Sequence, residues 1–345
     1  MFPARLRGGV HVRQVIPRDA IPSVDDPAFG DRYDGDPGDR VVAVDGDPPR
    51  AYPVRYLDYH EVVNDDLGGD VPRAARETVG KPTEGAEGAE PVAVTWCPLC
   101  GSAAVYDRTV EGRVLDFGVS GKLADDDLVL YDRQTESEWK QSSGAAIAGP
   151  LEGASLSVRP SAVLPWERFR EANPEGVVLR PPGGTSEAAG DSDTPEPIDY
   201  DDAPYADYLA GEGFGLAAHR GEGSREWSRA DLEPKAVVLG VECGGEAVGF
   251  PLPWVRAAGG VVQTTVGGRD VVVAATERAG VHAYADPGYA FELADGELVA
   301  DGTTWDPATG ESADGRQLRR LPTRRLFAFA WQDDHGPDAF YTRPE

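Results

Sequence analysis

Glycine and proline interrupt this chain at short intervals: 42 Gly and 29 Pro occur among 345 residues, about one residue in five. An isolated helix needs an unbroken stretch of roughly 12–15 residues, and this spacing leaves little room for one. Between the breakers lie runs of β-branched and other apolar residues, which are typical of strands. The clearest runs are 41–44, 92–96, 128–131, 236–239 and 271–274.

Short strands separated by turn residues are typical of β-sandwiches and barrels. The sequence therefore predicts a mostly β fold with few short helices. The helices expected are 57–64, 165–172, 205–209 and 253–258. Two acidic stretches that are poor in apolar residues are expected to be loops without regular structure. They are 81–91 and 181–202.

The order of short motifs in the first half of the chain recurs in the second half. A valine-rich run before Pro53 has a counterpart before Pro251, and the run 92–94 has one at 271–273. Such a repeat predicts one supersecondary plan used twice. We therefore expect two similar β-rich lobes, barrel- or sandwich-like, from an internal duplication. The predicted segments are an N-terminal extension at 1–34, a first lobe at 35–165, an acidic linker and connector at 166–229, and a degenerate second lobe at 230–345 that serves as scaffold.

Cys97 and Cys100 form a Cys-x-x-Cys pair directly after the predicted strand 92–96. Two thiols at this spacing can bind one soft metal ion, or form a disulfide with each other in a redox cycle. The alternative without chemistry is a pair of buried, small apolar side chains. The chain has only three cysteines, too few for a framework of disulfides, and this number fits a reducing compartment.

His60 is the second candidate, and it lies in a predicted helix before a turn. In the second lobe, the turn that corresponds to the cysteine turn is 276–280 without sulfur, and Ala258 lies near the counterpart of His60. One copy of the plan thus keeps polar groups that the other lacks. We expect the chemistry in the first lobe, with Cys97, Cys100 and His60 converging on one metal ion.

Other polar groups have ordinary interpretations. The aspartates at 125–127 lack the glycine and glutamate that an EF-hand loop requires, so they are expected to form an acidic turn. Cys243 in a hairpin turn and His282 after a strand are expected to have no functional role. Residues 136–141 are expected either to line a pocket over the cysteine turn or to cap the core.

Two motifs carry a resemblance to a known family. The segments YHEVVND at 59–65 and TWCPLCGSA at 95–103 resemble the domain-of-unknown-function 3179 family of archaea and bacteria, and the acidic composition resembles a haloarchaeal-type member. The resemblance extends over nearly the whole chain. It implies that His60 and the cysteine pair belong to the shared pattern of the family, and it is compatible with a copper-binding role.

Metal binding is the leading functional hypothesis. Two thiolates and one imidazole suit copper, with zinc as the alternative. The expected use is electron transfer or copper handling without catalysis, with a redox protein or a copper donor as the partner. One alternative is a thiol–disulfide oxidoreductase in which His60 or Lys122 lowers the pKa of the attacking thiol. The other is a structural zinc protein, which needs a fourth ligand.

The charge of the chain excludes several partners. Sixty acidic and 33 basic residues give a net charge of −27, which makes binding to nucleic acid or to an anionic membrane surface unfavourable. No run of 18 apolar residues predicts a membrane span. Acidic surfaces with little lysine suit molar salt, where the Debye length is only ~3 Å. We expect a cytoplasmic protein in a high-salt cytosol, or an extracytoplasmic one if an N-terminal signal has been removed.

Overall fold

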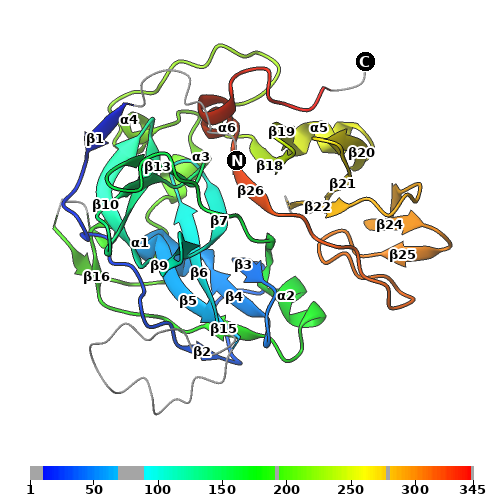
Figure 1. Cartoon of the computed structure of the whole chain (residues 1–345), viewed down its shortest axis with the longest axis horizontal. Coiled ribbons are helices and arrows are strands. Elements are labelled where there is room, and N and C mark those ends of the chain that lie inside the picture. The colour runs from blue at the N-terminus through cyan, green and yellow to red at the C-terminus, as the bar shows by residue number, and fades with distance from the viewer. Residues whose placement is uncertain (1–10, 69–88, 191–193, 277–279, 343–345) are drawn as a thin grey trace.

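The computed structural model describes residues 11–68, 89–190, 194–276 and 280–342, and the chain is mostly β-sheet (Figure 1). Four of the five runs expected as strands lie within β3 (Arg40–Val44), β6 (Glu90–Cys97), β11 (Asp127–Asp132) and β21 (Arg269–Ala275), and the run 236–239 overlaps β18 (Val237–Cys243). The mostly β prediction is therefore confirmed.

The first half is built from hairpins and short helices. β3 and β4 (Arg50–Pro53) form a hairpin, which α1 (Val54–His60) follows. An antiparallel meander comes next: β5 (Val62–Leu67), β6 and β7 (Ser102–Asp107). Further along the chain, β14 (Ser161–Pro165) pairs with β3 and leads into α2 (Trp166–Ala172).

The second half repeats this order of elements. β18 and β19 (Glu246–Pro251) form a hairpin, and α5 (Leu252–Ala257) and the meander β20 (Val261–Val266), β21 and β22 (Val281–Ala285) follow. β26 (Thr323–Phe327) then pairs with β18 and leads into α6 (Ala328–His335). The N-caps of α1 and α5 are both prolines, Pro53 and Pro251, with nearly equal backbone angles. This order is what the duplication hypothesis predicts, and the duplication itself stays a prediction.

The two halves share one sheet of six strands. Its order is β19-β18-β26-β7-β6-β5, so β26 of the second half pairs with β7 of the first. Figure 1 shows β26, in orange-red, between the strands of the two halves. The cysteine turn lies next to this junction, because it connects β6 to β7.

A second sheet covers one face of β6 and β7. It has five strands in the order β1 (Val12–Gln14), β10 (Phe117–Ala124), β11, β12 (Glu138–Lys140) and β13 (Ala145–Ala148). One core cluster contains Tyr106 of β7 together with Leu130 and Trp139 of this sheet. The space between the two sheets is therefore filled with apolar side chains, which exclude water from any polar group placed there.

The predicted helices differ from the observed ones mainly at α1. Three of the four expected helices match α2, α3 (Ala206–Ala210) and α5 to within one residue at each end. The fourth, expected at 57–64, is observed as α1 at Val54–His60 and is followed by β5. Glu61 adopts a left-handed φ of 57°, which ends the helix, and the β-branched Val62 and Val63 then pair with β6.

The stretch expected as a linker contributes to the fold. β15 (Val177–Leu179) pairs with β4 and with β2 (Phe29–Gly30). Within 181–202 lie β16 (Thr185–Ser186), the short 3-10 helix η2 (Glu187–Ala189) and β17 (Glu196–Pro197), whereas residues 191–193 lie outside the described ranges. The expectation of no regular structure is not met for these elements. Of the other expected loop, 81–91, residues 81–88 lie outside the described part, and Glu90 and Pro91 begin β6.

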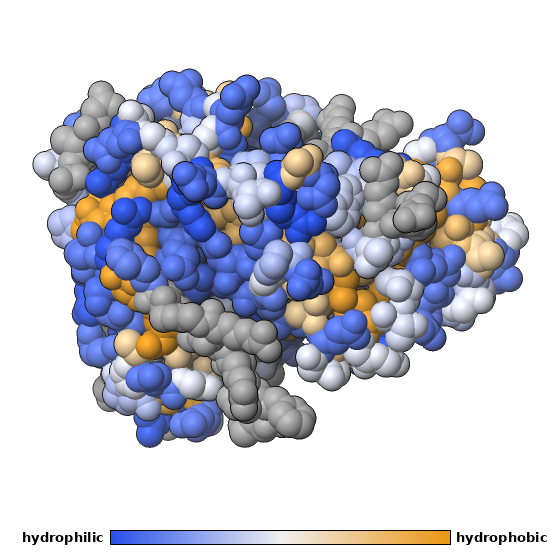
Figure 2. All heavy atoms as spheres, turned by 90° about the horizontal axis from the view of Figure 1, so that it is seen from above, coloured by the Kyte–Doolittle hydropathy of each residue, from blue (hydrophilic) through white to orange (hydrophobic). Residues whose placement is uncertain are grey.

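The remaining elements are short. They are β8 (Thr109–Val110), β9 (Arg113–Val114), α4 (Leu216–His219), β23 (Glu292–Ala294), β24 (Glu297–Ala300) and β25 (Thr303–Trp305). In the described ranges no helix has the length and apolar character needed to cross a membrane. Figure 2 shows one face of the molecule, where hydrophilic side chains predominate and apolar patches are small.

Candidate metal centre

Cys97 and Cys100 lie on the turn that joins β6 to β7. Cys97 is the last residue of β6 and pairs with Ser102, the first residue of β7. Successive side chains of a strand face opposite sides, so Trp96 packs in one core cluster and Cys97 in another. The thiol of Cys97 therefore faces the five-stranded sheet. Both cysteines are buried, with exposures of at most 1%.

Distant segments hold this turn in place. The backbone N–H of Phe327 donates to the carbonyl of Cys100 at 2.8 Å, and the Tyr208 hydroxyl donates to the carbonyl of Leu99 at 2.5 Å. Gly101 has a φ of 55°, and a Cβ added there would lie 2.6 Å from the ring of Phe327. The turn geometry thus depends on a glycine and on chain segments more than 100 residues away.

Asp127 completes the group from the opposite sheet. Asp125 and Asp126 have φ values of 54° and 66° and form the two-residue turn between β10 and β11. Asp127 is the first residue of β11 and is buried. The expected acidic turn is therefore real for two of the three aspartates, whereas the third enters the core.

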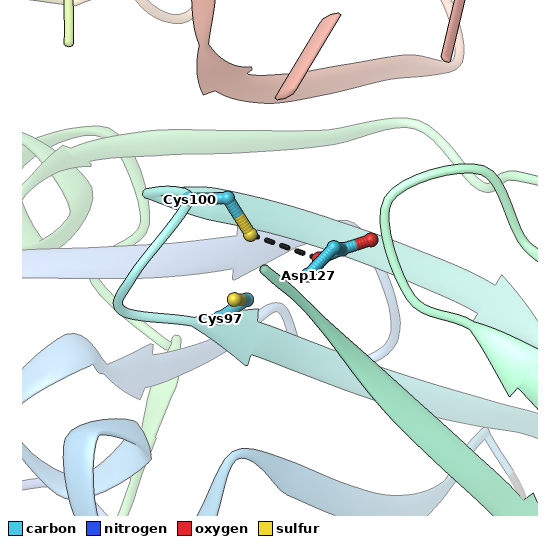
Figure 3. Close-up of side chains that lie close together, drawn as sticks. All are labelled: Cys97, Cys100 and Asp127. Carbon is cyan, nitrogen blue, oxygen red and sulfur yellow. Dashed lines mark hydrogen bonds between the residues drawn. The ribbon is translucent and has the colours of Figure 1, made fainter. Parts of the chain in front are cut away.

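The three side chains meet between the sheets (Figure 3). The thiol of Cys100 donates to Oδ1 of Asp127 at 2.8 Å. The two sulfur atoms and a carboxylate oxygen of Asp127 all lie within 4.8 Å of one another. Within the described ranges, no other group of three or more cysteine, histidine or acidic side chains brings its ligand atoms this close together. Two thiols and a carboxyl at one buried point form a candidate metal-binding site.

Burial keeps the thiols protonated in the absence of a metal. It raises the pKa of Cys97, and the carboxylates of Asp127 and Glu61 raise it further. It also raises the pKa of Cys100 well above its ordinary value. A protonated thiol is a poor nucleophile, whereas a metal ion can displace its proton and bind the thiolate.

A buried cation, Lys140, is linked to Asp127 through Ser142 and Asp334. Oδ2 of Asp127 accepts from the backbone N–H of Ser142 at 2.7 Å, and the Ser142 hydroxyl donates to Asp334 of α6 at 2.5 Å. The ammonium group of Lys140 lies 2.7 Å from Asp334. Burial opposes the charge of Lys140, but the carboxylates of Asp334 and Asp127 outweigh it and raise the pKa of Lys140. The network orients Asp127 and supplies a compensating positive charge.

Several buried polar atoms near the cysteine turn lack a hydrogen-bond partner among the described residues. They are Glu61 Oε2, Ser102 Oγ and Gln141 Oε1, three of the six such side-chain atoms in the described part of the chain. Ser102 is the register partner of Cys97, and the Gln141 amide donates to the Ser102 carbonyl at 3.4 Å. Buried polar groups are nearly always satisfied in folded proteins, so these atoms are available to hydrogen-bond a further polar group.

A cavity of about 80 Å³ opens beside Cys97. Its walls are mainly apolar, and Glu61 and Tyr205 line it together with Cys97. Burial raises the pKa of Glu61 to about 8, and the charges of Glu187, Asp58 and Asp127 contribute. The cavity therefore joins a thiol of the candidate centre to a second buried carboxyl.

His60, the third predicted ligand, lies outside the three-residue group. Its Nδ1 is 2.9 Å from the carbonyl of Pro22, and its Nε2 is 2.6 Å from the hydroxyl of Tyr200. Both ring nitrogens are therefore engaged away from the thiols, and burial lowers the pKa of the ring. The imidazole ties the end of α1 to two distant segments of the chain.

The other sequence candidates take structural places. Lys122 lines the cavity wall and pairs with Glu138, so its charge is shared with a carboxylate. Trp139 is buried in the core, and its indole N–H donates to Asp132 at 3.0 Å. Cys243 is half-buried at the end of β18.

Sequence reasoning missed the positions of Asp127 beside the thiols and of Glu61 in the cavity wall. The signal for Asp127 is its place directly after two aspartates that fit a hairpin turn, which makes it a strand residue. Glu61 adjoins His60 in the YHEVVND motif, yet the position gives no sign of a left-handed backbone or of a cavity.

The comparison with protein families covers most of the chain. A family described as "Protein of unknown function (DUF3179)" matches residues 18–74 and 83–339. The chain belongs to the DUF3179 family. The match includes every residue of the candidate centre in this DUF3179 protein. Searches of curated proteins and of solved structures find no match.

Proposed function

We propose that Cys97, Cys100 and Asp127 bind one divalent metal ion in this protein. The proposal rests on one observation: the three residues are buried, and their ligand atoms lie within 4.8 Å of one another. Two thiolates at ~2.3 Å from a tetrahedral ion lie about 3.8 Å apart, and carboxylate oxygens bind zinc at about 2.0–2.2 Å. Small side-chain movements therefore suffice to close the group around an ion.

The carboxylate favours zinc over copper in this proposal. Zinc is a borderline ion that accepts thiolate, imidazole and carboxylate ligands. Copper(I), the ion suggested by the cysteine pair and His60, is a soft ion that prefers sulfur and gains little from a carboxylate. Copper bound by the two thiolates alone is the second candidate, and a redox or copper-donor partner belongs to that alternative.

The site resembles a metal site with an open coordination position more than a closed structural site. A structural zinc ion has four protein ligands, whereas a catalytic or transport site keeps one position open. The group comprises three residues in the described part of the chain, and a cavity reaches Cys97. We therefore propose an ion with a fourth position that faces this cavity.

The thiol–disulfide alternative receives less support from the geometry. An attacking cysteine needs a lowered pKa and access to its partner. Both thiols are buried, and their pKa values are raised. The predicted activator His60 is engaged with Pro22 and Tyr200.

Metal titration of purified apoprotein tests the proposal. We expect one Zn²⁺ per chain, and one Co²⁺ with intense near-ultraviolet thiolate bands. Cys97→Ser should abolish stoichiometric binding, and Asp127→Asn should weaken zinc by more than about tenfold. Cys243→Ser, which removes the cysteine outside the group, is the matched control and should bind like the wild type.

Two outcomes would contradict the proposal. Stoichiometric zinc binding by Cys97→Ser would show that the cysteine turn is not the site. Tight Cu(I) binding that is unaffected in Asp127→Asn, with no zinc binding by the wild type, would favour the copper alternative.

A further inference from the structure

Glu61 occupies a backbone position that suits glycine. Its φ of 57° lies in the left-handed region, which side chains other than glycine, asparagine and aspartate rarely adopt. The second half has a glycine at the matching place. The N–H of Trp96 in β6 donates to the Glu61 carbonyl at 2.8 Å, and the N–H of Ala275 in β21 donates to the Gly260 carbonyl at 2.8 Å. The first half thus has a strained glutamate, Glu61, at the position where the second half has Gly260.

The Glu61 carboxyl is buried, and one of its oxygen atoms has no hydrogen-bond partner among the described residues. The residue is 7% exposed, and the oxygen without a partner is Oε2. The side chain lines the cavity beside Cys97. Strained residues and unsatisfied buried groups occur together mainly at functional sites, because elsewhere a glycine or an apolar residue is more stable.

The cavity and its charges define what can enter. A volume of about 80 Å³ accommodates roughly two to three water-sized groups at ~30 Å³ each. Two thiolates and a carboxylate around a divalent ion carry a net charge of −1. The cavity wall itself carries charges of both signs: it includes Glu187 as well as Lys122 and Arg220, and Lys122 is paired with Glu138. An anion that coordinates the ion directly is repelled by the three anionic ligands, whereas a neutral molecule is not.

We propose that this cavity binds a small neutral molecule of about two or three nonhydrogen atoms, which coordinates the metal through a lone pair and donates an N–H or O–H hydrogen bond to Glu61. Short alcohols and hydroxylamine-like molecules belong to this class. The inference rests on the proposed function, because it needs a metal ion with an open position. Glu61 is a ligand-binding residue in it, and Cys97, Cys100 and Asp127 hold the ion.

Cobalt-loaded protein allows a direct test. Hydroxylamine, which has a lone pair and hydrogen-bond donors, is titrated at pH 7 while the visible Co²⁺ bands are recorded. Azide, a similarly small anion without a hydrogen atom, is the comparison. We expect a saturable shift of the bands with hydroxylamine and a much weaker response to azide.

Variants assign the effect to Glu61. Glu61→Gly, the residue found in the second half, should keep cobalt binding and weaken hydroxylamine binding about tenfold to a hundredfold through the lost hydrogen bond. Asp58→Asn is the matched control. Asp58 is a carboxylate of α1 that lies close to Glu61 in the chain. It accepts a hydrogen bond from the indole N–H of Trp96 at 2.7 Å and does not line the cavity. It should leave the affinity within about threefold of the wild type.

The outcomes separate this inference from the proposed function. If wild-type protein shows no thiolate–cobalt bands, the metal proposal itself fails. If the bands appear but hydroxylamine leaves them unchanged, or if Glu61→Gly binds it as tightly as the wild type does, the metal site stands and the role of Glu61 is wrong. Equal losses in Glu61→Gly and Asp58→Asn would likewise overturn it, because they would show a general charge effect.

Discussion

At the scale of single residues, the candidate centre consists of groups that are costly to bury separately. A carboxylate and two thiols are buried together, and a buried ammonium group, that of Lys140, pairs with Asp334 of α6 behind them. Asp127 contacts both a thiol and the Ser142 backbone, which connects the centre to the Lys140–Asp334 pair. Removing one member therefore leaves an uncompensated partner.

Lys140→Met tests this dependence. Lys140 is 2% exposed, and its removal leaves the carboxylate of Asp334 buried without its cation. We expect the free energy of unfolding to fall by about 3–5 kcal/mol, measured by urea denaturation of the apoprotein. The double variant Lys140→Met/Asp334→Leu should recover a large part of the loss. A double variant no more stable than Lys140→Met would contradict the pairing.

Glu61 makes stability depend on pH. Its pKa is raised to about 8 in the folded protein, from an ordinary value of 4.5. Between these values the folded state binds more protons than the unfolded state, so the contribution of Glu61 to stability falls as pH rises from about 4.5 to 8. Glu61→Gln removes this dependence. Its stability relative to the wild-type apoprotein should rise by up to a few kcal/mol between pH 5 and pH 8 in urea denaturation. A constant difference across this range would contradict the raised pKa.

At the scale of elements, the site depends on how hairpins end. The β6–β7 turn supplies both thiols, the β10–β11 turn delivers Asp127 into its strand, and the end of α1 turns Glu61 toward the cavity. Each of these turns uses a left-handed residue. Local backbone geometry therefore decides where each functional side chain begins, and sheet packing decides what it meets.

Gly101→Ala tests the cysteine turn. The change places a methyl group at φ 55° and 2.6 Å from the Phe327 ring, so strain and overpacking add. We expect a loss of about 2–5 kcal/mol in unfolding free energy, together with weaker zinc binding. Gly153→Ala is the control, because Gly153 also has a positive φ but has no atom within 4 Å of an added Cβ. Its loss should be confined to about 1–2 kcal/mol, with zinc binding unchanged. Equal losses would show that the contact with Phe327 is unimportant.

At the scale of the whole molecule, charge and topology act separately. The fold joins its halves through the β26–β7 pair, whereas the net charge of −27 is a property of the surface composition. Several ion pairs offset part of the repulsion, such as Arg225 with Asp333 and Arg316 with Asp301. The excess of 27 negative charges has no such compensation in the sequence.

Salt should therefore stabilise the protein. At molar ionic strength the Debye length is ~3 Å, so repulsion between surface carboxylates is screened, whereas at 0.1 M it is ~10 Å. We expect the melting temperature of the apoprotein to rise steadily from 0.1 M to 2 M KCl in thermal denaturation followed by circular dichroism. A melting temperature that does not change over this range would contradict the interpretation of the charge as an adaptation to salt.

The sequence by itself determined the local structure. Glycine and proline spacing predicted a mostly β chain, valine-rich runs marked β3, β6, β11, β18 and β21, and the Cys-x-x-Cys spacing marked a turn with two thiols on it. These features follow from backbone sterics and strand propensity, which act between neighbours in the chain. The order of elements in the two halves was also visible, because it is a linear property of the sequence.

Only the tertiary structure decided which side chains meet the thiols. Asp127 is 27 residues from Cys100 and comes from another sheet, while His60, at the end of the helix before β5, is held by Pro22 and Tyr200. Register and sheet packing set these contacts, and no local pattern fixes how one hairpin stacks on another. Glu61 differs for a related reason: a left-handed backbone at a glutamate contradicts local preference and is maintained by the pairing of β5 and β6 around it.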